Sequence, residues 1–137
     1  MTEDYLFVYG TLRKNTERHD LLQRCCDYID TGMLQAVMYL ISYYPGVILT
    51  DDPQQQVVGE VYRIHQPQLL LAELDDYEEC SSAFPEPHEY QRQQVTVQTI
   101  NSTLKISTAW AYLYQYPVEN KQRISDGQFN MHFTDGK

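Results

Sequence analysis

The chain has 137 residues, enough for one domain with a sizeable hydrophobic core, and 42% of them are hydrophobic. That share is too high for a disordered chain, and the longest apolar runs are too short to span a membrane. The formal net charge of −9 argues against a nucleic-acid-binding protein, because the phosphates would be repelled. The acidic start at residues 1–4 lacks the basic region of a signal peptide, so we expect a cytoplasmic protein.

The cysteines and histidines do not indicate a metal centre or a disulfide framework. Of three cysteines, Cys25 and Cys26 are adjacent and Cys80 stands alone, and the four histidines are scattered. No CxxC or HExxH spacing occurs, and neither does a Gly-rich nucleotide-binding pattern or a GxSxG elbow. We therefore expect no metal, no cofactor and no serine or cysteine nucleophile.

The first hydrophobic stretch, residues 5–9, is followed directly by Gly10. Five apolar or aromatic residues in a row predict a buried strand, and glycine ends it because it tolerates unusual backbone angles. The chain becomes polar after Gly10, and the free backbone N–H groups of such a turn can point at an anion. The pattern alone leaves two interpretations open, an anion-binding turn and an ordinary turn.

Strand signals dominate the chain up to residue 64. The expected elements are a polar loop over 14–20, a weak helix over 21–28 that Asp30–Gly32 interrupts, one or two strands over 33–44, a turn at Pro45–Gly46 and a short strand over 47–49. A polar connection over 51–56 then leads to a strong strand over 57–64.

One helix and one hairpin are predicted in the second half. The helix begins at Gln66–Pro67, where the missing N–H of proline does no harm, and runs to Tyr77 or Glu78. Two prolines make residues 80–88 a loop, and strands over 90–100 and 106–114 flank a turn at 101–103, before a polar tail. The order predicts one α+β domain over 1–137, built on a sheet or small barrel.

An acidic cluster at the end of the predicted helix offers a candidate general base. Successive helical residues rotate by about 100°, so Leu71, Leu74 and Tyr77 form an apolar stripe. Glu78 is the acid of this cluster that points with the stripe, and a carboxylate there has a raised pKa, as a base near neutral pH needs. Alternatively, the helix ends at Tyr77 and Glu78 is solvated. Glu60 ranks lower, because carboxylates on strands usually lie on a solvated edge.

The chain contains 12 tyrosines and one tryptophan. Tyrosine combines an apolar body with a polar tip, which suits the wall of a polar pocket and equally suits a half-buried strand. Strand register decides between these roles. The tyrosines in question are Tyr62, Tyr90, Tyr112 and Tyr114.

Several short motifs occur in order along nearly the whole chain. They are Val8–Arg13, Tyr43–Gly46, Gly59–Tyr62, Leu74–Glu78, Tyr90–Arg92, Ala111–Tyr112 and Ile124–Phe129. Together they resemble the γ-glutamylcyclotransferase-like superfamily, and most of all its short bacterial members and the γ-glutamylamine cyclotransferases. Each motif is weak by itself, but their order is specific.

This resemblance implies a small mixed β-barrel flanked by a few helices, with the active site at one mouth of the barrel. It implies that backbone amides of the first turn hold the α-carboxylate of a γ-glutamyl substrate. Glu78 would act as general acid and base, producing 5-oxoproline and a free amine without any cofactor. The substrate-binding residues that it implies are Tyr9, Gly10, Thr11, Leu12 and Tyr90.

Some residues depart from the family pattern or keep other functions open. Glu79 stands where the family often has glycine, and the loop over 80–88 is longer than the minimal version, which leaves the amine undefined. Arg13 and Arg92 are candidates for substrate contacts or for structural ion pairs. The alternatives are a non-catalytic binding protein of the same fold and a different acid–base lyase acting on another amino-acid derivative.

Overall fold

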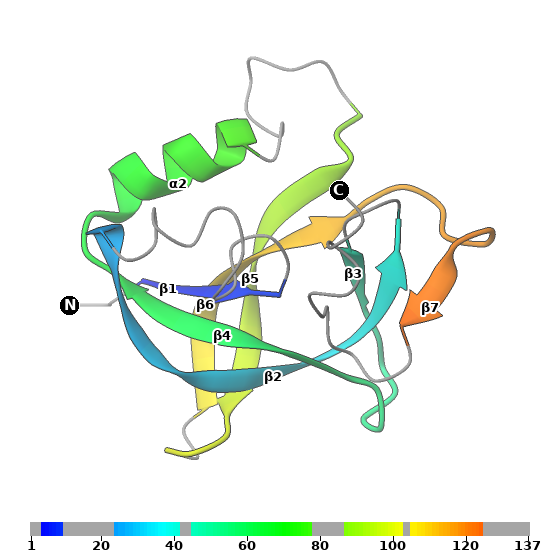
Figure 1. The fold of residues 1–137 in the computed structure, drawn as a ribbon, viewed down its shortest axis with the longest axis horizontal. Coiled ribbons are helices and arrows are strands. Elements are labelled where there is room, and N and C mark those ends of the chain that lie inside the picture. The colour runs from blue at the N-terminus through cyan, green and yellow to red at the C-terminus, as the bar shows by residue number, and fades with distance from the viewer. Residues whose placement is uncertain (1–3, 10–23, 42–44, 78–86, 103–104, 125–137) are drawn as a thin grey trace.

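The computed structural model of the chain describes residues 4–9, 24–41, 45–77, 87–102 and 105–124. Its elements are β1 (Tyr5–Val8), β2 (Cys26–Leu40), β3 (Pro45–Leu49), β4 (Gln56–Ile64), α2 (Pro67–Tyr77), β5 (Tyr90–Thr99), β6 (Lys105–Tyr114) and β7 (Gln122–Ile124) (Figure 1). Within these residues, no helix has the length and apolar composition needed to cross a membrane.

Five strands close into a barrel in the order β2, β4, β1, β6, β5 and back to β2. β1 pairs parallel with β6, and the other neighbouring strands pair antiparallel. β3 and β7 extend the second half of β2, on either side of it (Figure 1). The predicted α+β fold with a small mixed barrel is confirmed.

Alternating side chains of β1 separate two buried clusters. Phe7 and Tyr9 belong to the cluster inside the barrel, whereas Leu6 and Val8 belong to a second cluster on the outer face of the strand. α2 covers this outer face (Figure 1). α2 contributes Leu70, Leu71 and Leu74 to the second cluster, and Leu71 and Leu74 are two residues of the predicted apolar stripe.

The four tyrosines for which the sequence left two roles undecided, pocket wall or half-buried strand, lie in the second cluster. All of them are buried, and they pack with the apolar face of α2. They therefore form part of the core between the barrel wall and α2. Their aromatic rings bury a large area on this face of the sheet. These residues are Tyr62, Tyr90, Tyr112 and Tyr114.

β2 corrects two expectations. The weak helix predicted over 21–28 is wrong from Cys26 onward, and the break predicted at Asp30–Gly32 is wrong, because β2 continues through both. Long-range pairing with β4 from Cys26 to Gln35 overrides the local propensities. Near Asp30, β2 shows a shift of its register with β4, between Tyr28 and Asp30, and it does not end there.

The interior of the barrel leaves no space for a side chain at two facing glycines. Gly32 and Gly59 are partners in the β2–β4 pair. A Cβ on Gly59 would lie 2.3 Å from the Val8 carbonyl oxygen and 2.7 Å from the Phe7 ring. A Cβ on Gly32 would lie 2.6 Å from a methyl group of Val97. The two glycines therefore let the barrel close around Phe7.

Two further expectations are corrected near the second half of β2. The turn predicted at Pro45–Gly46 is wrong, because both residues begin β3 and pair with the end of β2. Proline is tolerated as the first residue of a strand, and a Cβ on Gly46 would lie 2.9 Å from the Tyr114 ring. The segment that the sequence analysis describes only as a polar tail contains β7, where Ile124 pairs with Met38 and joins the interior cluster.

A buried carboxylate holds the β5–β6 turn against β2. Asp30 is 3% exposed and accepts hydrogen bonds from the backbone N–H groups of Thr31, Asn101 and Ser102, and from the side chains of the latter two, at 2.7–3.0 Å. These donors, the Ser102 N–H foremost, lower the pKa of Asp30 to about 2. Asp30 thus extends the contact between β2 and the β5–β6 hairpin beyond the paired residues Gly32 and Met33.

We predict that part of the acid sensitivity of the fold comes from Asp30. The folded pKa of about 2 lies below the value of about 3.9 in an unfolded chain, so the carboxylate stabilises the fold above about pH 4 and loses this effect toward pH 2. Urea midpoints should therefore fall more steeply across this window in the wild type than in Asp30→Asn, which should be less stable at pH 7. Parallel pH profiles would contradict this role.

A second prediction concerns the close approach at Gly59. Gly59→Ala should lower the free energy of unfolding by about 1–3 kcal/mol, because the new methyl group collides with backbone that cannot rotate away. Val58→Ala, at a partly exposed position of the same strand, serves as control and should cost less than about 1 kcal/mol. Urea denaturation measures both. Equal stability of the two variants would show that β1 shifts to accommodate the methyl group.

Candidate active site

Two of the predicted site residues lie at the same end of the barrel. β1 and β6 are parallel, so Tyr9 follows β1 at the end where Tyr112 lies, and β5 begins there with Tyr90 because it is antiparallel to β6. We call this end, marked by Tyr9, Tyr90 and Tyr112, the Tyr9 rim. The other predicted site residues lie outside the described residues, namely Gly10, Thr11, Leu12 and Glu78.

Tyr9 is fixed at the rim by its side chain. It is buried in the interior cluster, with its ring centroid 6.5 Å from that of Phe7. Its hydroxyl donates a hydrogen bond to the backbone carbonyl of Tyr112. The side chain therefore anchors the residue at which the candidate turn begins.

Tyr90 is also buried, and its hydroxyl contacts protein. The hydroxyl donates to the Pro45 carbonyl at 2.6 Å, and the ring packs edge-on against Tyr114 with centroids 5.5 Å apart. Tyr90 therefore joins β3 to the barrel at the rim. A contact between Tyr90 and substrate stays a prediction.

Glu60, the second candidate base, occupies a central strand. The expectation of a solvated edge was wrong, because β4 lies between β1 and β2, and Glu60 pairs with Val8 and with Thr31. Its Oε1 accepts a hydrogen bond from the Tyr62 hydroxyl at 2.8 Å. Burial, together with this carboxylate, raises the pKa of Tyr62 far above its ordinary value, so the hydroxyl keeps its proton and remains a donor.

The carboxylate of Asp75 ties the end of α2 to the Tyr9 rim by contacting Arg92 and Tyr112. We call these three residues the Asp75 clamp. Arg92 donates from Nε to Oδ1 of Asp75 at 2.8 Å and from Nη2 to Oδ2 at 3.1 Å. The Tyr112 hydroxyl donates to Oδ1 at 2.7 Å. Arg92 was left open as a substrate contact or an ion-pair residue, and the structure shows the ion pair. The register of β5 and β6, which creates this contact, is not readable from the sequence.

The buried Cys26 does not have the thiolate of an activated nucleophile. Burial, followed by the neighbouring Cys25 and Asp27, raises the pKa of the Cys26 thiol to about 12. The thiol therefore stays protonated near neutral pH, whereas a nucleophilic cysteine needs the thiolate.

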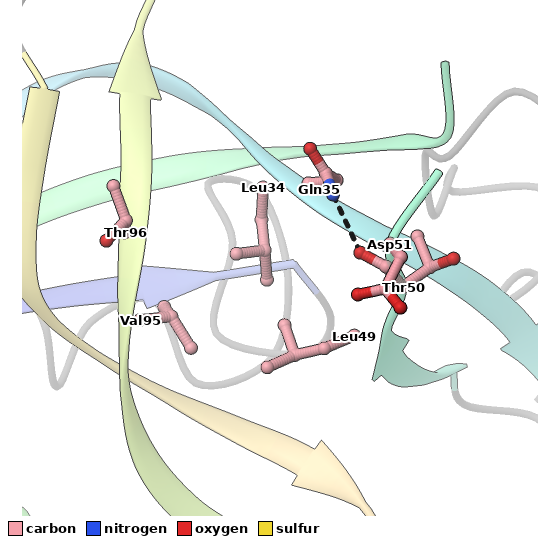
Figure 2. A pocket seen from close by; sticks show the side chains of 7 residues that line it. All are labelled: Leu34, Gln35, Leu49, Thr50, Asp51, Val95 and Thr96. Atoms are coloured by element: carbon pink, nitrogen blue, oxygen red, sulfur yellow. Dashed lines mark hydrogen bonds between the residues drawn. The ribbon is translucent and has the colours of Figure 1, made fainter. Parts of the chain in front are cut away.

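A groove of about 350 Å³ lies where β2 parts from its neighbours (Figure 2). β2 pairs with β5 at Gly32 and Met33 and with β3 from Ala36 onward, so Leu34 and Gln35 lie in the gap between them. Its lining residues are Leu34, Gln35, Leu49, Thr50, Asp51, Val95 and Thr96. Sequence reasoning missed this groove because it depends on long-range register.

The groove combines an apolar floor with a polar rim. Leu34 and Val95 belong to the interior cluster that also contains Tyr9. Gln35 donates from Nε2 to the Thr50 carbonyl at 2.8 Å, across the groove edge (Figure 2). Asp51 is the lining residue that carries a charge, so the groove suits an uncharged or cationic group better than an anion.

Comparison with known sequences relates the whole described barrel to one family. The family model described as gamma-glutamyl cyclotransferase, AIG2-like, matches residues 6–131. A γ-glutamylcyclotransferase-family relative from Vibrio cholerae is 35% identical over 112 residues, which cover 80% of this chain and 81% of that protein. The γ-glutamylcyclotransferase family protein YtfP of Escherichia coli is 31% identical over 124 residues, which cover 90% and 94% of the two chains.

Solved structures share the fold. The crystal structure of YkqA from Bacillus subtilis matches 99% of this chain with a TM-score of 0.71 and 26% identity, and this chain spans 44% of YkqA. A mouse AIG2-like protein matches 95% of this chain, and 97% of its own, with a TM-score of 0.63 and 20% identity, a likeness of fold alone. With its barrel, its motifs and a family match over residues 6–131, the chain belongs to the γ-glutamyl cyclotransferase, AIG2-like family.

Proposed function

We propose that this protein cyclises a γ-glutamyl amine or γ-glutamyl peptide, releasing 5-oxoproline and the free amine, with Glu78 as general acid and base. One observation carries the proposal. The residue before Gly10 and the last turn of α2, which precedes Glu78, meet at the Tyr9 rim through Tyr112. The two motifs most important for the resemblance thus start from one place in the fold.

The binding half of the site is assigned to the backbone that follows β1. Consecutive backbone N–H groups in a turn form an anion-binding concavity, which suits the α-carboxylate of a γ-glutamyl group. Tyr9 supports this assignment because its buried ring and its bond to the Tyr112 carbonyl fix the start of the turn. The amides assigned to the carboxylate belong to Tyr9, Gly10, Thr11 and Leu12.

The chemical half is assigned to Glu78. Glu78 takes a proton from the α-ammonium of the substrate, and the freed amine attacks the γ-carbonyl carbon. A C–N bond forms to close the five-membered ring, and the original amide C–N bond breaks. Glu78 returns the first proton to the leaving nitrogen, and the second proton that the attacking nitrogen loses on becoming the ring amide leaves on the released amine, as its ammonium form. Atoms and charges balance without a co-reactant, because the nucleophile is part of the substrate.

The fold contributes mainly through positioning. Attack within one molecule gains a large effective concentration once the substrate is held in its folded conformation. The rim of the barrel provides this restraint if it holds the α-carboxylate of the substrate at one point and the base, Glu78, at another. A carboxylate next to the apolar stripe of α2 also has a raised pKa, which brings a base closer to neutral pH.

We predict that Glu78→Gln abolishes turnover while leaving the fold intact. Glutamine keeps the shape of the side chain and removes the base, so kcat should fall by about 10²–10⁴-fold. The measurement is release of 5-oxoproline from a panel of γ-glutamyl amines and γ-glutamyl dipeptides. Glu73→Gln makes the same chemical change at an exposed position of α2 and should keep the wild-type kcat.

Two outcomes would contradict the proposed function. Equal turnover by wild type and Glu78→Gln would remove Glu78 from the chemistry and bring Glu60 forward as the base. If wild type turns over no member of the panel, and γ-glutamyl ligands bind equally to both proteins, the chain is a binding protein of this fold.

A further inference from the structure

We propose that the Asp75 clamp positions the end of α2 for catalysis. It sets the place of Glu78 relative to a substrate bound by the backbone that follows Tyr9. This inference rests on the proposed function. It assigns a role to Asp75, Arg92 and Tyr112 as residues that act through the backbone of α2 rather than by touching the substrate.

The clamp has the geometry of a directional restraint. Arg92 and Asp75 meet through two parallel N–H···O bonds, and their side chains are 25% and 19% exposed. The Arg92 guanidinium also lies over the Trp110 ring, 4.5 Å from its centroid. The indole Nε1 of Trp110 in turn donates to Asp4 at 3.1 Å. A bidentate pair that is also stacked on an aromatic ring fixes both position and orientation.

The sequence of α2 places an unfavourable charge at the end of the helix, which the clamp compensates. Asp75 and Asp76 lie in the last turn, where the helix dipole disfavours negative charge, and that turn contains no basic residue. Arg92 on β5 supplies the positive charge that the helix itself lacks at this end. A local preference is thus violated and then compensated by a tertiary contact, a pattern typical of functional sites.

Attachment of the helix does not by itself require the clamp. Leu70, Leu71 and Leu74 already bury the apolar stripe of α2 against the barrel. Apolar burial is non-directional, and a partly exposed ion pair adds little stability. What the clamp adds is control over the rotation and height of the last turn.

Tyr112 connects this last turn to the binding half of the site. Its hydroxyl donates to Asp75, while its backbone carbonyl accepts from the Tyr9 hydroxyl. Asp75 stands three residues before Glu78 in the sequence, and Tyr9 directly precedes Gly10. One residue of β6 therefore sets the spacing between the two segments that carry the proposed chemistry.

The test separates positioning from stability by comparing kcat, KM and thermal unfolding. Asp75→Asn and Arg92→Lys should each lower kcat by about 10- to 100-fold with KM changed less than about twofold, because small misplacement of a base is costly. Arg92→Lys keeps the charge but loses the bidentate geometry, so the fold should persist. Tyr112→Phe keeps the carbonyl bonded to Tyr9 and should cause a smaller loss of kcat.

A matched control exists at the opposite end of the barrel. Arg63 pairs with Asp27 at 2.6 Å between β4 and β2, so Arg63→Lys makes the same change in a more exposed Arg–Asp ion pair and should leave kcat unchanged. The double variant Asp75→Asn/Arg92→Lys should be no slower than the slower single variant, because both changes break one clamp.

Three results would overturn the proposal. Wild-type kcat in both Asp75→Asn and Arg92→Lys would leave the clamp a purely structural contact and the proposed function intact. An equal loss in Arg63→Lys would show a general effect on the fold. Absence of turnover by the wild type itself would refute the proposed function and the positioning role together, which the other two results do not do.

Discussion

The closure of the barrel by β2 is the constraint on which the rest of the structure depends. This 15-residue strand pairs with β4 and β5 in its first part, and with β3 and β7 in its second. It passes around Phe7 only because Gly32 and Gly59 face each other without side chains. The divergence of β3 and β5 from the same strand opens the groove floored by Leu34 and Val95.

Two carboxylates hold the two ends of this barrel in different ways. Asp30 anchors the β5–β6 turn to β2 at one end, within a set of short hydrogen bonds that keep it charged. Asp75 anchors the end of α2 at the other, where Tyr9 and Tyr112 meet. We predict that the first carboxylate contributes to the acid sensitivity of the fold, and we propose that the second positions the end of α2 for catalysis.

Local signals in the sequence predicted much of the fold, and long-range pairing explains most of the remainder. The leucine spacing of α2 and the strand signals over 90–100 were sufficient, because one face of each element is buried. The sequence predicted a break at Asp30, within what is one strand, β2. The prediction failed because the strands that pair with β2 are distant in the sequence. The environments of Glu60 and Arg92 likewise required strand order and register. Glu78 came from the helical projection of the acidic cluster and from the family resemblance, and it lies outside the described residues.

The most direct test of the central claim identifies the product that wild-type protein forms from one γ-glutamyl amine in 18O-labelled water. Intramolecular cyclisation predicts 5-oxoproline and free amine in equal amounts, with no label in the product, because the oxygen of its lactam carbonyl comes from the substrate. Labelled glutamate would show that water, and not the substrate's own amine, attacks the γ-carbonyl. That result would contradict the cyclotransferase assignment for this member of the family.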